Sequence, residues 1–323
     1  MKKALITGIN GQDGSYLAEF LLEKGYQVHG IVRRSSIENA SKLYNLKNIL
    51  DKIYLHSCNI ENQLSVYKII SEIKPDECYH LAAFSFVSYS FDDETNIIST
   101  NFNSTHFLLS SIKELVPECK FYFAGSSEMF GNTDESPQNE NTKFNPRSIY
   151  GISKLSSYYL VKNYRERFGL FCCTGIAYNH ESPRRDYSFV TRKISSGISK
   201  ILRKEIDRIE LGNINAIRDW GYAPDYVKAM WLMLNKNDKA EDFIISTGIG
   251  HTVEDLLKIA FDYINKDYRE YIHINSNFFR ESEKTPLIGD NSKIKNKLNW
   301  ENTKNIKDII IEMIENDIKQ NKI

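Results

Sequence analysis

The sequence feature that most constrains the fold is a glycine pattern near the amino end, Gly8-x-x-Gly11-x-x-Gly14. It follows a short apolar run, residues 4–6, and precedes residues 16–24, whose apolar side chains recur at helical spacing. A strand that passes through a glycine turn into a helix brings the backbone close to a pyrophosphate bound at the helix N-terminus. The spacing differs from the usual Gly-x-Gly-x-x-Gly pattern, and glycines also occur in ordinary turns. The interpretation therefore depends on the surrounding chain.

The amino-terminal half alternates apolar runs with helix-like stretches. Further runs occupy residues 27–32, 53–55, 77–81 and 121–124. Parallel strands need crossover connections, which helices supply, so this alternation predicts an α/β fold with a Rossmann-like, doubly wound parallel sheet. From about residue 178 the pattern becomes irregular, which predicts a smaller, interleaved C-terminal substrate domain.

The predicted division of the chain follows from this change of pattern. The nucleotide-binding Rossmann domain is expected to comprise residues 1–177 and 219–248, and the substrate-binding domain residues 178–218 and 249–323. Within these parts, helical spacing predicts helices at residues 190–204, 225–234 and 306–318.

Composition limits the partners. Lys plus Arg and Asp plus Glu both number 42, so no excess charge indicates a nucleic-acid or anionic-membrane partner. The first apolar run is too short for a signal peptide, and no run approaches the roughly 18 apolar residues of a membrane span. The five cysteines lack Cys-x-x-Cys spacing, so we expect them to be reduced and the protein to be cytoplasmic. The seven histidines form no metal-binding pattern, so we expect no metal site.

Residues that follow the predicted strands indicate the cofactor. The second run leads into Arg33-Arg34-Ser35, where an enzyme that uses NAD would present an acidic residue to the ribose. Two guanidinium groups suit a 2′-phosphate, which favours NADP; the alternative is a solvated surface pair. Asn59 is a candidate hydrogen-bond partner of the adenine. Residues 81–83, Leu-Ala-Ala, are small enough to let the cofactor lie close.

A second group of residues indicates proton chemistry. Tyr150 and Lys154 lie one helical turn apart, so both side chains reach the same face. A nearby ammonium lowers the pKa of a tyrosine, which would make Tyr150 a competent acid or base near neutral pH. Ser126 and Glu128 follow the run at 121–124, at the edge where ligands bind in such sheets. Simple dehydrogenases of this type need the Ser, Tyr and Lys but no added carboxylate. Glu128 therefore indicates a second proton transfer, unless it is a solvated loop residue.

Segments throughout the chain resemble the GDP-mannose 4,6-dehydratase family of extended short-chain dehydrogenases/reductases. The similar segments are residues 7–17, 33–36, 179–185, 211–221 and 225–234, with shorter matches at 279–280 and 289–290. The resemblance implies a hydro-lyase that converts a GDP-hexose to the GDP-4-keto-6-deoxyhexose with NADP. It also implies a homodimer or homotetramer.

The resemblance, together with the patterns above, assigns the site residues. The catalytic set is Ser126, Glu128, Tyr150 and Lys154. The cofactor-binding set is Gly8, Gly11, Gln12, Asp13, Gly14, Arg33, Arg34, Ser35, Asn59, Ile60, Leu81, Ala82, Ala83, Tyr150 and Lys154. The nucleotide-sugar contacts are Ser85, Asn179, Arg185, Arg218, Arg280 and Glu283.

The implied mechanism is an internal redox cycle. Tyr150 takes the proton of the C4 hydroxyl while a hydride leaves C4 for NADP, and the resulting ketone acidifies C5. Glu128 then removes the C5 proton and helps the C6 hydroxyl leave as water, after which the hydride returns to C6. Lys154 supports the phenolate, and Ser126 hydrogen-bonds the C4 oxygen.

The chain departs from the family pattern in places that matter for the substrate. Ser126 stands where the family usually has Thr, which keeps the hydroxyl. Residues 84–87 are Phe-Ser-Phe-Val where the family commonly has Gln-Ser-His-Val, and the stretch between His251 and Arg280 is shorter. The last two changes can reshape the hexose pocket, so GDP-N-acetylglucosamine stays an alternative to GDP-mannose.

Two other functions stay open at this point. A nucleotide-sugar epimerase or reductase on the same scaffold would not need a carboxylate at Glu128. A catalytically idle NADP-binding protein would have no physical need for Ser126, Tyr150 and Lys154 together.

Overall fold

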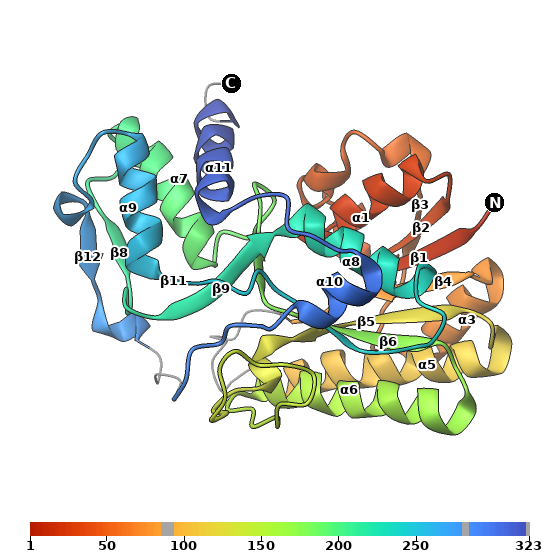
Figure 1. Cartoon of the computed structure of the whole chain (residues 1–323). Coiled ribbons are helices and arrows are strands. Elements are labelled where there is room, and N and C mark those ends of the chain that lie inside the picture. The colour runs from red at the N-terminus through yellow and green to blue at the C-terminus, as the bar shows by residue number, and fades with distance from the viewer. Residues whose placement is uncertain (85–93, 280–283, 321–323) are drawn as a thin grey trace.

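The structure is a computed structural model of the 323-residue chain and describes residues 1–84, 94–279 and 284–320 (Figure 1). The main sheet contains β1 (Lys3–Thr7), β2 (Gln27–Val32), β3 (Tyr54–Ser57), β4 (Glu77–His80), β5 (Lys120–Ser126), β6 (Cys172–Ala177) and β10 (Phe243–Ile245). Two small sheets contain β7 (Asn179–Glu181), β9 (Ile217–Tyr222) and β11 (Gly250–Thr252), and β8 (Ile209–Leu211) and β12 (Ile272–Ile274).

The helices are α1 (Gln12–Glu23), α2 (Arg34–Ile37), α3 (Gln63–Ile73), α4 (Glu94–Ile98), α5 (Ser104–Leu115), α6 (Ile149–Phe168), α7 (Val190–Leu202), α8 (Ala223–Asn235), α9 (Val253–Tyr263), α10 (Ser292–Leu298) and α11 (Ile306–Gln320). Short 3-10 turns include η1 (Ala40–Leu46), η2 (Leu50–Lys52), η5 (Ser127–Met129), η6 (Tyr268–Glu270) and η7 (Ser276–Phe278). A single π-helical turn, η4 (Ser99–Asn103), joins α4 to α5.

The main sheet has the strand order β10-β6-β5-β4-β1-β2-β3, and neighbouring strands in it run parallel. From β1 the chain winds outward through β2 and β3, then returns to β4 and winds the other way through β5 and β6. This confirms the predicted doubly wound sheet. The strand order reverses between β1 and β4, which is where such sheets open a crevice for ligands.

Helices cover both faces of the sheet because successive strand residues point to opposite sides. In β1, Ile6 packs into a core cluster with side chains of α1, α8 and α10, such as Leu17 and Met230. Its neighbour Leu5 packs into a second cluster with side chains of α3, α5 and α6, such as Leu109. Figure 1 shows α1 and α8 above the sheet and α5 and α6 below it. The result is a three-layer arrangement.

A smaller part with its own core lies beside the sheet, to the left in Figure 1. Here α7, α9 and α11 bury Ile198, Leu257 and Ile310 in one cluster. A buried ion pair between Arg192 of α7 and Asp317 of α11, with 2.5 Å between nitrogen and oxygen, joins two of these helices. The three predicted helices of the C-terminal half are found within one to two residues of their expected ends, as α7, α8 and α11.

One segment of the predicted substrate-binding domain packs against the nucleotide-binding domain instead. Ile294 and Leu298 of α10, and Trp300 after it, lie in the core cluster of α1 and α8 although they follow residue 249. The indole of Trp300 is fully buried and donates to the carbonyl of Asp225 at 2.7 Å. The chain therefore crosses back to the main sheet once more before α11.

Two further features concern all described residues. In residues 1–84, 94–279 and 284–320, no helix has both the length and the apolar character that a membrane crossing requires. In the same part of the chain, no group of three or more His, Cys, Asp or Glu side chains is arranged to hold a metal ion. The five cysteines, Cys58, Cys78, Cys119, Cys172 and Cys173, are buried free thiols, as predicted.

Candidate functional site

A cavity of about 1600 Å³ opens where the strand order reverses and extends to the smaller part of the molecule. Most of the predicted residues line it. On the cofactor side these are Gly8, Gly11, Gln12, Asp13, Gly14, Arg33, Ser35, Asn59, Ile60, Leu81, Ala82 and Ala83. The catalytic candidates that line it are Ser126, Glu128, Tyr150 and Lys154, and the sugar-nucleotide candidates are Asn179, Arg185 and Arg218.

The glycine turn at the end of β1 is built for close approach. Gly8 has a φ of +72°, in the left-handed region that favours glycine. A Cβ atom on Gly14 would lie 2.3 Å from the carbonyl oxygen of Gly8 and 2.6 Å from the Cα atom of Ile9. The twelve-residue helix α1 then begins after Gly11 without a side-chain cap, so its first amides face the cavity as an anion site would require. The turn fits the pyrophosphate of a dinucleotide.

We expect Gly14→Ala to abolish dinucleotide binding. The contact of the added methyl group would be with backbone atoms, which cannot rotate away, so the turn must open. Gly25→Ala is the control. Gly25 has a positive φ but nothing within 4 Å of its Cβ position, so this variant strains the backbone at a site away from the cavity. Fluorescence titration with NADP⁺ measures the effect. Unchanged binding by Gly14→Ala would contradict the assignment of this turn.

A series of buried hydrogen bonds joins the ends of β1 and β4 behind the turn. Thr7 Oγ1 accepts hydrogen bonds from the amides of Leu81 and Ala82, each 3.1 Å away, so its own proton goes to His80 Nδ1 at 2.8 Å. The other ring nitrogen of His80 then donates to Ser104 Oγ at 3.1 Å. Burial lowers the pKa of His80 to about 3, so the ring is neutral and this arrangement is stable at physiological pH.

The residues after β2 separate into two groups. Arg33 faces the cavity, with its guanidinium 5.2 Å from the ring centre of Phe84, while Arg34 does not line the cavity and pairs with Glu38 at 2.8 Å. Lys42 lines the cavity beside Ser35, with Nζ 3.3 Å from Ser35 Oγ. The second cation near Arg33 is therefore Lys42, which the motif did not indicate because it lies in η1.

The catalytic candidates converge at the end of β5 and the start of α6. Ser126 caps the 3-10 turn η5, its hydroxyl accepting from the Glu128 amide at 3.2 Å. Tyr150 and Lys154 lie in the first turns of α6, which Ser148 caps. Tyr150 forms a hydrogen bond with Ser126, and the Glu128 carboxylate acts electrostatically on Tyr150. All four side chains line the same cavity.

The expected lowering of the pKa of Tyr150 is wrong for this structure. Burial raises the pKa of Tyr150 to about 12; the hydrogen bond with Ser126 opposes this rise, and Glu128 adds to it. Burial also lowers the pKa of Lys154 to about 7. Lys154 Nζ donates to the carbonyl of Ala124 at 2.8 Å and lies 5.8 Å from the ring centre of Tyr150. The one-turn spacing brings the two residues to one face, but burial disfavours the charged form of each and sets the direction of both pKa shifts.

Asn101 does not line the cavity, but it supports the site from behind and was not indicated by the sequence. It is buried in the π-helical turn η4, and its Oδ1 accepts from the Phe84 amide at 2.9 Å. Its Nδ2 donates to Ser153 Oγ at 3.0 Å, next to Lys154. Asn101 therefore ties the strand-end loop to the catalytic helix. No motif surrounds it, because a π turn has no sequence signature of its own.

The part of the cavity formed by α7, β9 and the chain before α7, which we call the cationic wall, carries three cations. Arg185 pairs with buried Glu181 at 3.2 Å and lies 3.6 Å from the ring centre of Phe189. Lys193 of α7, which was not predicted, lines the cavity with Nζ 4.6 Å from the ring centre of Phe278. Arg218 on β9 also lines this wall. Three cations on one wall suit an anionic ligand such as a nucleoside diphosphate.

Three of the predicted contacts lie outside the described residues: Ser85, Arg280 and Glu283.

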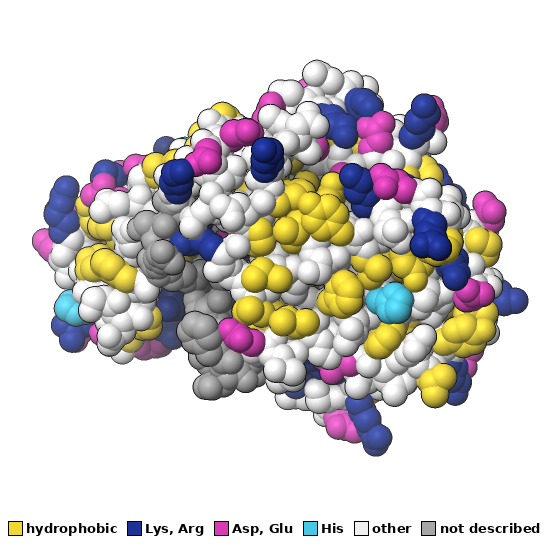
Figure 2. All heavy atoms as spheres, turned by 90° about the horizontal axis from the view of Figure 1, so that it is seen from below, with side chains coloured by type: hydrophobic (Ala, Val, Ile, Leu, Met, Phe, Trp, Pro, Cys, Tyr) yellow, Lys and Arg dark blue, Asp and Glu magenta, His cyan; other side chains and the backbone are white. Residues whose placement is uncertain are grey.

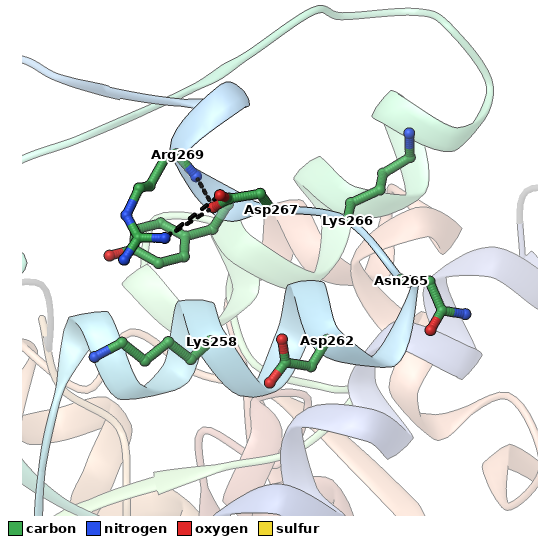
Figure 3. Close-up of a pocket in the computed structure, with 7 residues that line it drawn as sticks. Lys258, Asp262, Asn265, Lys266, Asp267 and Arg269 are labelled. Atoms are coloured by element: carbon green, nitrogen blue, oxygen red, sulfur yellow. Dashed lines mark hydrogen bonds and ion pairs between the residues drawn. The ribbon is translucent and has the colours of Figure 1, made fainter.

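A second hollow, of about 560 Å³, lies at the far end of α9 (Figure 3). In Figure 3 Lys258 and Asp262 project from α9, and Asp267 bonds to Arg269. None of the predicted site residues lines this second hollow, so we assign no function to it.

Comparison with known proteins gives a consistent result. A family model described as GDP-mannose 4,6 dehydratase matches residues 5–313. The GDP-mannose 4,6 dehydratase of Cricetulus griseus is 44% identical over 342 residues, which cover 98% of this chain and 92% of that protein. The structure of a Thermotoga maritima UDP-glucose 4-epimerase with UDP-glucose has a TM-score of 0.87 at 25% identity and covers 98% of this chain and 99% of its own.

A second solved structure, a Bacillus anthracis dTDP-glucose 4,6-dehydratase in complex with NAD, has a TM-score of 0.86 at 20% identity, covering 100% of this chain and 98% of its own. That likeness concerns the fold alone. The family model and the Cricetulus griseus relative, by contrast, match nearly the whole sequence. The chain belongs to the GDP-mannose 4,6-dehydratase family.

Proposed function

We propose that the protein converts GDP-mannose to GDP-4-keto-6-deoxymannose and water. One observation carries the proposal: a carboxylate, Glu128, shares a cavity with the Ser126, Tyr150 and Lys154 side chains at the end of a dinucleotide-type turn. Oxidation at C4 needs one proton acceptor, whereas loss of water from C5 and C6 needs another. Family membership and the activity named for the Cricetulus griseus relative support GDP-mannose as the substrate.

We propose that the cofactor is a nicotinamide dinucleotide, specifically NADP. When bound, the nicotinamide supplies reversible hydride storage, which lets C4 be oxidised and C6 be reduced with no net redox change. The glycine turn fits the pyrophosphate, and the Arg33 and Lys42 cations beside Ser35 suit a 2′-phosphate. The Bacillus anthracis neighbour, which was solved in complex with NAD, supports the cofactor class.

We expect Arg33→Ser to weaken NADP⁺ binding by about 10- to 100-fold, since hydrogen bonds to charged groups contribute roughly 1.5–3 kcal/mol. Binding of NAD⁺, which has no 2′-phosphate, should change little. Arg34→Ser is a matched control, because its guanidinium pairs with Glu38 outside the cavity. Calorimetric titration with both nucleotides measures the ratio of the NADP⁺ and NAD⁺ dissociation constants. Equal losses for NADP⁺ and NAD⁺ would contradict the assignment.

The proposed chemistry divides between two residues. Tyr150 accepts the proton of the C4 hydroxyl as the phenolate, the minority form near neutral pH at a pKa of about 12, and Ser126 hydrogen-bonds the C4 oxygen. Glu128 then removes the proton from C5 and delivers one to the departing C6 hydroxyl. Water leaves, C6 receives the hydride that C4 lost, C5 regains a proton, and C4 remains a ketone, so atoms and electrons balance.

We propose that the cationic wall binds the GDP part. Asn179 follows the end of β6, near the sugar side of the cavity, and Arg185, Lys193 and Arg218 present positive charge to a diphosphate. Arg280, Glu283 and Ser85 remain proposed contacts. The predicted division of the chain then assigns the dinucleotide to residues 1–177 and 219–248 and the sugar nucleotide to residues 178–218 and 249–323.

Incubation with GDP-mannose in one arm and GDP-N-acetylglucosamine in another tests the function. The proposal expects a 4-keto-6-deoxy product, lighter by one water, from GDP-mannose. If only GDP-N-acetylglucosamine gives product, the proposed substrate is wrong but the proposed reaction, 4,6-dehydration, is retained. A 4-epimer of unchanged mass would indicate an epimerase and overturn the proposal.

We further propose that the protein is a cytoplasmic homo-oligomer, at least a homodimer. In Figure 2 hydrophobic side chains gather at the centre of the face that lies below the sheet. Ile152 and Tyr159 lie two turns apart on α6, and Ile98 lies on the adjacent α4; all three are exposed. A second copy packed there would remove this surface from water. Light scattering should give at least twice the chain mass of 37.5 kDa, and a monomer would contradict this proposal.

A further inference from the structure

The first turn of α1 is bonded to the chain that carries Asn179. Gln12 Nε2 donates to the carbonyl of His180 at 3.0 Å, and Ser182 Oγ donates to Gln12 Oε1 at 2.8 Å. Next to them, Asp13 Oδ2 lies 2.8 Å from His180 Nε2. The helix start that would hold a pyrophosphate and the strand that would hold the sugar nucleotide are therefore joined directly.

The hydrogen bonds of His180 determine its charge. Its Nδ1 lies 2.7 Å from the carbonyl oxygen of Tyr178, an atom that can only accept, so Nδ1 must carry a proton. Its Nε2 faces the Asp13 carboxylate, which also accepts and already receives a bond from Gln12 at 3.1 Å. With Asp13 ionised, as its lowered pKa favours, both ring nitrogens donate, and His180 is then an imidazolium paired with a carboxylate.

The surroundings agree with this assignment. Burial alone would lower the pKa of His180, but attraction to Asp13 and their hydrogen bond raise it, although Arg185 opposes them. The same pair lowers the pKa of Asp13 against the effect of burial. Tyr226 of α8 stacks on the ring, with centres 4.5 Å apart, and Glu181 is a further acid that acts on His180. The side chains of His180 and Asp13 are only 12% and 22% exposed.

The position of Asp13 gives the pair a consequence. A carboxylate in the first turn of a helix is favoured by the helix dipole, but here it lines the cavity where an anionic pyrophosphate would bind. Left unpaired, it would repel that anion. The imidazolium cancels its charge and holds β7, and with it Asn179, against the glycine turn.

We propose that His180, as an imidazolium bound to Asp13, is a positioning residue that neutralises the anion-binding turn and fixes the substrate strand β7 to it. The proposal rests on the proposed dinucleotide function. Its two parts predict different things: a doubly protonated ring in the protein itself, and a charge-dependent loss of NADP⁺ affinity when His180 is replaced.

The first test is nitrogen NMR of histidine-labelled wild-type protein at pH 7. The proposal expects His180, assigned by its absence from His180→Gln, to have two protonated ring nitrogens at a pH above the ordinary imidazole pKa of about 6.5. Buried His80, with its pKa lowered to about 3, is the internal reference for a neutral ring. A neutral His180 overturns the proposal, whatever nucleotide the protein binds.

The second test is NADP⁺ affinity. Gln at position 180 keeps a donor but no charge, so His180→Gln should weaken binding at least about tenfold, as expected when one partner of a buried pair is removed. The double variant Asp13→Asn/His180→Gln should bind NADP⁺ more tightly than His180→Gln does, because no unpaired carboxylate remains. Glu72→Gln, which breaks the exposed Lys68–Glu72 pair on α3 away from the cavity, is the control with little expected effect.

Wild-type affinity in His180→Gln, or a double variant no better than the single one, overturns the proposal. Circular dichroism and thermal melting monitor folding. If His180→Gln does not fold, the NMR result on the wild type decides, with the His180 signals assigned through its backbone connections to residues 179 and 181. Failure of the wild type to bind NADP⁺ contradicts the proposed cofactor instead, and it leaves the charge state of His180 measurable.

Discussion

Replacing Tyr150 with phenylalanine is expected to lower kcat for GDP-mannose dehydration by about 10²- to 10⁴-fold, the usual contribution of a positioned acid or base. The ring is buried and bonded to Ser126, so Phe fills the same volume and removes only the hydroxyl. Substrate and NADP⁺ should therefore still bind. Steady-state kinetics with GDP-mannose, combined with nucleotide titrations, separates the two effects.

Tyr158→Phe is the matched control for this variant. Tyr158 lies two turns along the same helix, burial raises its pKa to about 12 as well, and its ring packs edge-on against Phe144 at 5.1 Å. It does not line the cavity, so its loss should change kcat little. If Tyr158→Phe were as damaging as Tyr150→Phe, the effect would be structural and the acid–base role of Tyr150 would be wrong.

Glu128→Gln is expected to reduce water elimination by a similar factor of about 10²- to 10⁴-fold, because the amide cannot take the C5 proton. Oxidation at C4 uses Tyr150 and should continue. Rapid mixing with GDP-mannose should therefore give reduced nicotinamide on the enzyme without release of 4-keto-6-deoxy product. Wild-type rates of product formation would show that the carboxylate is not the group that acts at C5.

Periodic patterns predicted the scaffold well. Apolar runs such as residues 27–32 became strands because helices cover both faces of a parallel sheet, so its strands are near-continuously apolar. The glycine turn was also predictable, because Gly8 and Gly14 have no substitute where Cβ atoms would meet backbone. Tyr150 and Lys154 were brought to one face by helix geometry alone.

Properties that depend on three-dimensional surroundings were not predictable. The high pKa of Tyr150 comes from burial, which its spacing from Lys154 does not reveal. Arg33 and Arg34 are adjacent, yet only Arg33 faces the cavity, since a helical turn directs neighbours apart. The pairing of Asp13 with His180 joins residues 167 positions apart, and no local pattern encodes such a contact.

Transfer of a deuterium label from C4 tests the central claim most directly, because the claim is that Tyr150 and Glu128 drive an internal redox cycle in one cavity. GDP-mannose labelled with deuterium at C4 would be incubated with the enzyme in ordinary water. Our account predicts a 4-keto-6-deoxy product that carries the deuterium at C6. A product without the label, or a labelled 4-epimer that has lost no water, would contradict it.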